Sequence, residues 1–271
     1  MIAITDMDFP TYQAIDALNW STLKHMDKSP AHFKHARDND RPDSTRMAMG
    51  RAVHCAVLEG DAFPLSFTVF KGGARRGNAW TDFKAANEGV TILTEDEYAT
   101  VLAVRDAVHA YGPARDLLCN GIAESCLFWT DPTTGIECKA RPDFVDGAIL
   151  VDLKTTGTVD AREFGRTAGR LLYHGQMSFY ARGVSATTGV DVDASIIAVE
   201  LDAPHDVAVF DIDSVTALAG DQLVDRFLGE VARCRESGQY PGRYPEPRPL
   251  ELPAYLLDSD DFGITIGGEA L

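Results

Sequence analysis

The sequence contains few of the residues that cross-link a protein or anchor it in a membrane. Five cysteines occur among 271 residues, an odd number, and no two of them form a Cys-x-x-Cys pair. No segment approaches the ~18 consecutive apolar residues of a membrane-spanning helix. The first ten residues, MIAITDMDFP, lack the basic and apolar parts of a secretory leader. We therefore expect a reduced, cytoplasmic protein rather than a disulfide scaffold or a membrane protein.

Motifs for two common cofactors are also missing. The glycine-rich stretch over residues 71–77, KGGARRG, does not end in Gly-Lys-Ser/Thr, so it is not a P-loop and no nucleotide is expected. The seven histidines show no spacing typical of a zinc site, so zinc is not expected either.

Basic side chains are scarce. The chain has 25 Lys+Arg against 41 Asp+Glu, a formal net charge of −16. As an average, this charge disfavours binding to a polyanion such as nucleic acid. The acidity is uneven, because residues 184–271 hold 17 acidic and 5 basic side chains, whereas residues 1–90 hold 11 of each. Local basic side chains in the first two thirds can therefore still meet a polyanion.

Helical and strand periodicities alternate along the chain. Helices are expected over residues 46–59, 95–119, 160–184 and 214–237, and strands over residues 122–130, 136–145, 148–155, 194–201 and 206–212. This order predicts an α/β fold with a central mixed β-sheet of about five strands flanked by helices. We expect a single domain over residues 1–271, with a helical N-terminal section (1–90), an α/β core (91–237) and an irregular tail (238–271).

One predicted hairpin gathers charged residues. If Asp146-Gly147 is its turn, Asp143 projects on the same side as Asp152, roughly 7–8 Å away on the diagonal. Lys154 shares that face because side chains alternate along a strand. Two carboxylates so placed can hold one divalent ion, and their hard oxygen atoms suit Mg²⁺ or Mn²⁺. The alternative is an ion pair between Asp152 and Arg141 on a solvated face.

The residues at this hairpin resemble a known motif. Pro142-Asp143 followed by Asp152-Leu153-Lys154 is similar to the PD-(D/E)xK nuclease superfamily, whose core is restriction-endonuclease-like. Two flanking motifs resemble its RecB-like branch and the phage-type exonuclease VIII group: a Gly-x-x-x-His helix ending at His54, and a Gln-x-x-x-Tyr helix from Gln176 to Tyr180.

The resemblance implies roles for individual residues. It implies Asp143, Asp152 and the backbone carbonyl of Leu153 as metal ligands, Lys154 as the catalytic lysine, His54 as a ligand or phosphate-side helper, and Gln176 and Tyr180 as residues that orient the site or touch DNA. Glu124 is a further candidate ligand. The loop over residues 131–135 puts Glu124 opposite Pro142, on the wrong face, whereas a slip of one residue puts it opposite Asp143.

The resemblance also implies an activity and partners. It implies a Mg²⁺- or Mn²⁺-dependent exonuclease that resects double-stranded DNA ends for phage-type recombination, with a single-strand annealing protein as partner and a homo-oligomer, possibly ring-shaped. Relatives with an iron–sulfur cluster use four cysteines, but the last third of this chain has only Cys234, so no cluster is expected. Lys71, Arg75 and Arg76 could contact DNA phosphates or belong to a surface loop.

Two other functions remain open from the sequence. One is a structure-specific or CRISPR-adaptation-type endonuclease of the same superfamily. The other is a non-catalytic DNA-binding protein on this scaffold.

Overall fold

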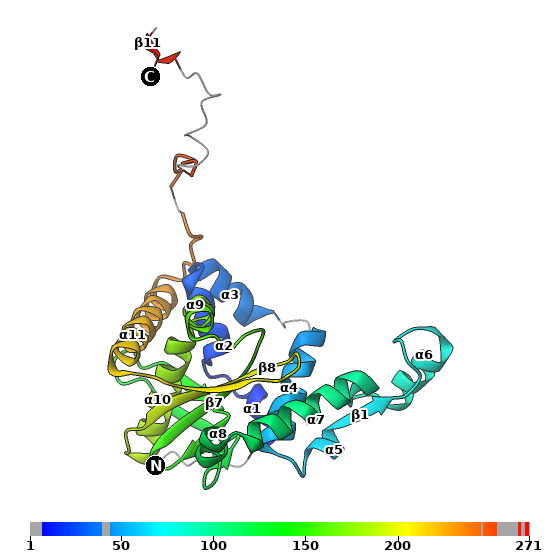
Figure 1. The fold of residues 1–271 in the computed structure, drawn as a ribbon. Coiled ribbons are helices and arrows are strands. Elements are labelled where there is room, and N and C mark those ends of the chain that lie inside the picture. The colour runs from blue at the N-terminus through cyan, green and yellow to red at the C-terminus, as the bar shows by residue number, and fades with distance from the viewer. Residues whose placement is uncertain (1–6, 40–43, 245, 254–264, 267–268, 271) are drawn as a thin grey trace.

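A five-stranded sheet forms the centre of the protein (Figure 1). The structure is a computed structural model that describes residues 7–39, 44–244, 246–253, 265–266 and 269–270. The strand order is β3-β6-β7-β8-β9, and only β7 and β8 run parallel. The strands are β3 (Ile122–Ala123), β6 (Phe144–Asp146), β7 (Ile149–Thr156), β8 (Asp193–Glu200) and β9 (Val207–Asp211). The predicted mixed sheet of about five strands is confirmed.

Both faces of this sheet are covered by helices. Leu150 and Ile196 point to one face and pack with α10 (Tyr173–Thr188) and α11 (Ser214–Ser237). Val151 and Ile197 point to the other face and pack with α4 (Thr45–Leu58) and α7 (Glu95–Ala110). Adjacent residues serve opposite faces because strand side chains alternate. The central strands are therefore apolar on both faces, and any charge there is exceptional.

The remaining elements surround this sandwich. A two-stranded unit, β4 (Leu127–Thr130) with β5 (Glu137–Ala140), packs against α10. The shorter helices are α1 (Phe9–Ala14), α2 (Trp20–Leu23), the 3-10 helix η1 (Lys24–Asp27), α3 (Pro30–Asp38), α5 (Phe63–Ser66), α8 (Gly112–Leu117) and α9 (Ala161–Leu171).

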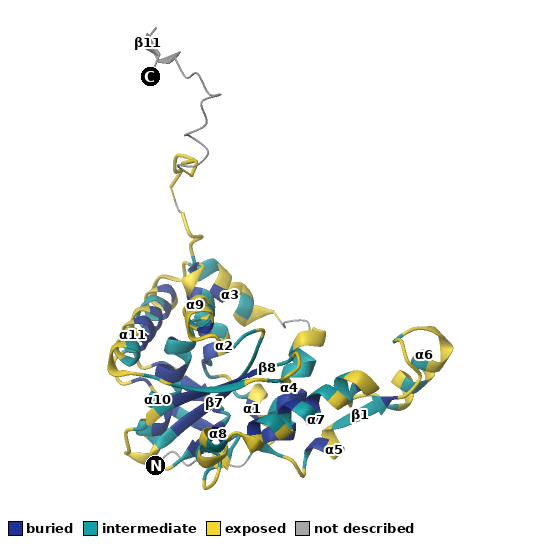
Figure 2. Cartoon of the chain, in the orientation of Figure 1, coloured by how far each residue is buried: buried dark blue, intermediate teal, exposed yellow. Residues whose placement is uncertain are grey.

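Residues 67–94 form a projection that we call the arm. Two strands, β1 (Phe67–Phe70) and β2 (Thr91–Thr94), pair in parallel and carry α6 (Gly77–Ala86) away from the sandwich (Figure 1). No residue of α6 is buried, in contrast to the central strands (Figure 2). The helical N-terminal section thus also contains one strand, β1.

Several expected elements are split in two. The strand expected over 122–130 divides into β3 and β4, because Glu124 adopts a left-handed backbone with φ of 52°. The strand expected over 136–145 divides at Pro142, which has no amide to donate, into β5 and β6. The helix expected over 160–184 breaks at Leu172, whose φ is 60°. The helix expected over 95–119 divides into α7 and α8.

The tail differs along its length. Residues 238–244 and 246–253 form no helix or strand, while β10 (Thr265–Ile266) pairs with β11 (Glu269–Ala270). The rest of the expected irregular tail lies outside the described residues. Within the described ranges, no helix is long and apolar enough to cross a membrane.

Candidate functional site

The hairpin β6–β7 places Asp143 beside β7. Asp146 pairs with Ile149, so Gly147-Ala148 is the turn and Asp146-Gly147 is not. The register therefore differs by two residues from the one expected, and a shift of two keeps every side chain on its face. The Asp143 Oδ2 atom accepts a hydrogen bond of 2.7 Å from the backbone amide of Leu153. Asp143 is thus fixed against the segment that carries Asp152.

Asp152 is fully buried and held by two partners. The Gln176 Nε2 atom donates to Asp152 Oδ1 at 2.9 Å, and the Lys154 ammonium forms an ion pair with Asp152 Oδ2. The alternative of a solvated pair between Asp152 and Arg141 is wrong. Arg141 instead pairs with Glu124 at 3.0 Å, and Asp152 has no exposed surface. A buried carboxylate among apolar strands is costly, so its retention points to a function.

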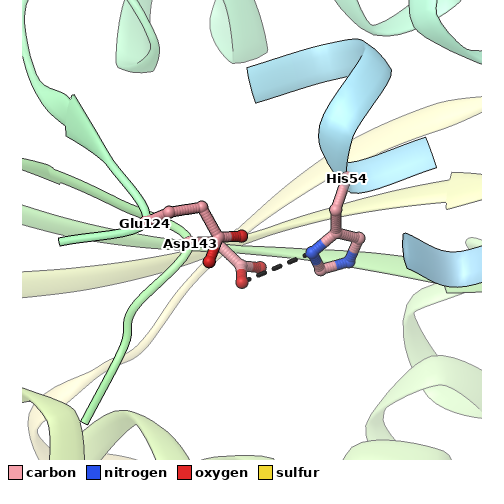
Figure 3. A group of neighbouring side chains, drawn as sticks. All are labelled: His54, Glu124 and Asp143. Atoms are coloured by element: carbon pink, nitrogen blue, oxygen red, sulfur yellow. Dashed lines mark ion pairs between the residues drawn. The ribbon is translucent and has the colours of Figure 1, made fainter. Parts of the chain in front are cut away.

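His54 reaches the same place from α4. Its Nδ1 atom lies 3.3 Å from Asp143 Oδ1 (Figure 3). Gly50 lies one turn earlier on the same helix face, and a Cβ atom added there would meet nothing within 4 Å. The protein's own packing does not require this glycine, which leaves open space beside His54.

Glu124 completes a group of three. Its backbone amide donates to the Asp143 carbonyl at 3.0 Å. The strand pairs β3–β6 before Glu124 and β4–β5 after it share one register, and this register places Glu124 opposite Asp143. Of the two registers considered from the sequence, the structure therefore has the one that is shifted by one residue, with Glu124 opposite Asp143 and not opposite Pro142. One ligand atom from each of His54, Glu124 and Asp143 lies within 4.8 Å of the other two (Figure 3). Asp152 is not part of this group, although all four residues adjoin the start of the β6–β7 hairpin.

Two carboxyl groups of the site resist ionisation. Burial raises the pKa of Asp152 to about 6, although the Lys154 ammonium opposes this. Burial and the neighbouring Asp143 carboxylate raise the pKa of Glu124 to about 7, against the effect of Arg141. A bound cation would remove this penalty, because it favours the ionised form of each carboxyl group.

The pKa values of the remaining groups are shifted toward their charged forms. Burial acts to raise the pKa of Asp143, but His54 and Lys154 outweigh it, and the pKa is lowered. Burial acts to lower the pKa of His54, but Asp143 outweighs it, and the pKa is raised. The Lys154 pKa is raised because Asp152 and Asp143 outweigh the effect of its burial. Lys154 is thus a proton-bearing cation and a weak base here.

Helix α10 supplies the two residues of the Gln-x-x-x-Tyr motif. Gln176 and Tyr180 lie one turn apart, and Gln176 Nε2 also donates to the Tyr180 hydroxyl at 3.2 Å. Tyr173, at the start of the same helix, has its ring 4.8 Å from the Lys154 Nζ atom. Its contact with Lys154 depends on the break at Leu172, which no pattern in the sequence indicates.

The three basic residues of the glycine-rich stretch lie elsewhere, on the arm. Arg75 donates to both carboxylate oxygens of Glu97, at 2.9 and 2.6 Å, and to the Ile92 carbonyl at 2.8 Å. Lys71 and Arg76 are exposed. The loop that holds them precedes α6, which Figure 1 places far from β7. A direct role of these residues in DNA binding stays a prediction.

The donor set is suited to a hard divalent cation. Carboxylates from Glu124, Asp143 and Asp152 offer oxygen atoms, and His54 offers one nitrogen. These donors match Mg²⁺ or Mn²⁺ better than zinc, which favours several histidine or cysteine ligands. The five cysteines are free thiols and do not belong to the three-residue group of Figure 3.

Comparison with solved structures shows the same fold in another protein. Among solved structures, the chain is similar to a candidate exonuclease from Eubacterium rectale, with a TM-score of 0.60 at 12% identity over 94% of this chain and 99% of that one. An alkaline exonuclease from Laribacter hongkongensis matches at a TM-score of 0.32 and 14% identity, over 71% of this chain and 95% of that one. The first likeness shows a shared fold, and the second is too low to support an argument. No curated protein matches the sequence.

A family model settles the relationship. It matches residues 19–246, a range that contains the whole sandwich, the arm and every residue of the site. The family is described as PDDEXK-like, which refers to the PD-(D/E)xK motif. The superfamily predicted from Pro142-Asp143 and Asp152-Leu153-Lys154 is therefore confirmed. The chain belongs to the family described as the PDDEXK-like domain of unknown function (DUF3799).

Proposed function

We propose that this protein is a Mg²⁺- or Mn²⁺-dependent deoxyribonuclease that hydrolyses phosphodiester bonds. The observation that carries the proposal is the set of Asp143, fully buried Asp152 and Lys154 on one hairpin, which His54 and Glu124 join from other elements. Such a set is costly to bury without a function.

Asp143, Asp152, His54, Glu124 and the Leu153 carbonyl are the proposed ligands. A divalent ion held there would polarise the phosphate and lower the pKa of a bound water.

The side chains around the ligands have separate tasks. Lys154, which stays protonated, is placed to stabilise negative charge that develops on the phosphate oxygens. Gln176 orients Asp152 through its amide and is itself held by Tyr180. Gln176 and Tyr180 therefore act as positioning residues in this proposal.

The substrate and setting are further parts of the proposal. The resemblance to the exonuclease VIII group favours double-stranded DNA ends as the substrate and end resection for phage-type recombination in the cytoplasm. It also favours a single-strand annealing protein as partner and a homo-oligomer, with a ring as one form. An endonuclease of the same superfamily remains the alternative activity.

A digestion assay tests the activity and its type. The full-length protein should degrade linear duplex DNA with Mg²⁺, lose this activity in EDTA, and spare covalently closed circular duplex. Cleavage of the closed circle would favour the endonuclease. Absence of metal-dependent cleavage of any DNA would overturn the proposal.

Two variants assign the activity to the site. Asp152→Ala and Lys154→Ala should each abolish cleavage, while circular dichroism shows that the fold persists. The matched controls are Lys34→Ala and Asp38→Ala, which break an exposed ion pair of the same residue types on α3. The controls should keep wild-type activity. Cleavage by the Asp152 or Lys154 variants at the wild-type rate would place the chemistry elsewhere.

A further inference from the structure

Helix α9 carries a row of arginines on its outer face. Arg162, Arg166 and Arg170 are spaced four residues apart, so they lie on one side of the helix and span about 12 Å along its axis. All three are exposed. Among the described residues, no ion pair or side-chain hydrogen bond engages any of their guanidinium groups. We call these three residues the arginine row.

The opposite face of α9 anchors the helix. Phe164 is buried, and Ala168 and Leu172 pack against the same hydrophobic cluster. Within the helix, Phe164 and Ala168 each follow an arginine of the row by two positions, which is about 200° around the helix. Packing therefore fixes the arginine row toward solvent.

The surface beside the arginine row is unusually bare. Gly165 and Gly169 are exposed in the body of the helix, and a Cβ atom added at either would meet nothing within 4 Å. Glycine weakens a helix relative to alanine, and the protein's own packing does not explain these two. Their absence of side chains lets a large ligand approach the helix backbone between the arginines.

The C-terminal end of the arginine row adjoins α10, the helix that carries Gln176 and Tyr180. Arg170 precedes Tyr173 by three residues, and the Tyr173 ring lies 4.8 Å from Lys154 Nζ. Burial, with Asp152, raises the pKa of the Tyr173 phenol, and the charges of Lys154, Arg46 and Arg170 oppose this rise. Arg46 stands in the first turn of α4, the helix that carries His54. The charges of Arg46 on α4 and Arg170 on α9 thus both act on the phenol whose ring contacts Lys154.

We propose that the arginine row of α9 binds the phosphate backbone of duplex DNA and guides the strand toward the site. The proposal rests on the proposed nuclease function for the identity of the polyanion. Guanidinium groups suit phosphate through paired hydrogen bonds, and they need no base sequence to do so. A row of about 12 Å can follow several consecutive phosphates of one strand.

The salt dependence of DNA binding tests this proposal. Binding of a linear duplex is measured by fluorescence anisotropy in EDTA, where no metal supports cleavage, at a series of salt concentrations. Each phosphate contact contributes about 0.9 to the slope of log K against log salt. Arg166→Gln with Arg170→Gln should lower the slope by about 2 and weaken binding roughly tenfold or more at 0.1 M salt.

Two companion variants make the result specific. Arg105→Gln with Arg115→Gln removes the same charge from helices α7 and α8, where each arginine pairs with the adjacent aspartate, and should leave the slope unchanged. Arg166→Lys with Arg170→Lys should keep most of the slope. An equal loss of slope in the Arg105/Arg115 variant, or an unchanged slope in the Arg166/Arg170 variant, would contradict the proposal that the arginine row binds DNA.

The failure of the row and the failure of the nuclease proposal are distinguishable. Binding that depends on the arginine row without Mg²⁺-dependent cleavage would contradict only the nuclease activity. Cleavage with a slope that is insensitive to Arg166 and Arg170 would contradict only the row.

Discussion

Glu124 offers a quantitative test of the site, because its carboxyl group is held in an unfavourable ionisation state. The side chain is 21% exposed, and burial together with Asp143 raises its pKa from 4.5 to about 7. Arg141 opposes this rise without cancelling it. In the absence of metal, ionised Glu124 is therefore a source of instability.

The direction follows from proton linkage. Between pH 4.5 and 7 the folded protein holds the Glu124 proton more tightly than the unfolded chain does, so this group makes stability fall as the pH rises. The difference between the two pKa values corresponds to about 3 kcal/mol, fully lost above about pH 8. Glu124→Gln abolishes this titration. Arg141 keeps a partner in the variant, because its Nε atom also donates to the Glu124 backbone carbonyl at 3.0 Å.

Urea unfolding in EDTA measures the effect. At pH 8.5 Glu124→Gln should be more stable than the wild type by up to about 3 kcal/mol, and at pH 4.5 the two should converge. Glu251→Gln, a substitution of an exposed residue in the tail, is the control and should track the wild type at both pH values. Added Mg²⁺ should stabilise the wild type more than Glu124→Gln. A variant that is less stable than the wild type at pH 8.5 in EDTA would refute the reasoning.

Three further substitutions have defined outcomes. Gly50→Ala should stabilise the protein by up to about 1 kcal/mol in thermal unfolding, because the added methyl group meets no other atom. The same substitution should reduce DNA cleavage if the substrate occupies the space beside Gly50, and unchanged cleavage would contradict this use of the space. Gln176→Leu should lower kcat with little change in DNA affinity, since Asp152 loses its amide donor; an unchanged kcat would deny the positioning role. Lys139→Met should cost about 2–4 kcal/mol in urea unfolding, because the buried Nζ atom bonds the carbonyls of Tyr12, Gln13 and Ile15; a cost below 1 kcal/mol would contradict this.

The face shared by Asp143, Asp152 and Lys154 could be predicted because strand side chains alternate. The predicted turn, Asp146-Gly147, was wrong, although Asp-Gly is a strong hairpin signal. In the structure Gly147, with φ of 32°, is the first residue of the turn and Ala148 is the second. The error was harmless because a register shift of two residues preserves the faces.

The placement of Glu124 and Tyr173 depends on backbone conformations that cannot be predicted from the residue types. Glu124 and Leu172 both adopt positive φ, which neither residue type favours. The first of these ends β3 and lets Glu124 face Asp143, and the second turns Tyr173 toward Lys154. Sequence periodicity could not reveal them, because both residue types ordinarily adopt negative φ.

The overall acidity likewise concealed a local feature. A net charge of −16 suggested poor attraction for DNA, yet Arg162, Arg166 and Arg170 form a row on α9, the helix that precedes α10. The spacing of four residues is visible in the sequence. The structure was needed to show that these arginines face solvent, because the packing of Phe164 and Ala168 determines which side of α9 is exposed.

We propose above all that His54, Glu124, Asp143 and Asp152 hold a divalent ion at the start of the β6–β7 hairpin. The most direct measurement is anomalous scattering from a crystal of the wild-type protein grown with Mn²⁺. We predict one or two peaks about 2 Å from carboxylate oxygens of Asp143 and Asp152, with His54 or Glu124 among the neighbours. Absence of a peak at Asp143, with Mn²⁺ bound elsewhere or nowhere, would contradict the claim.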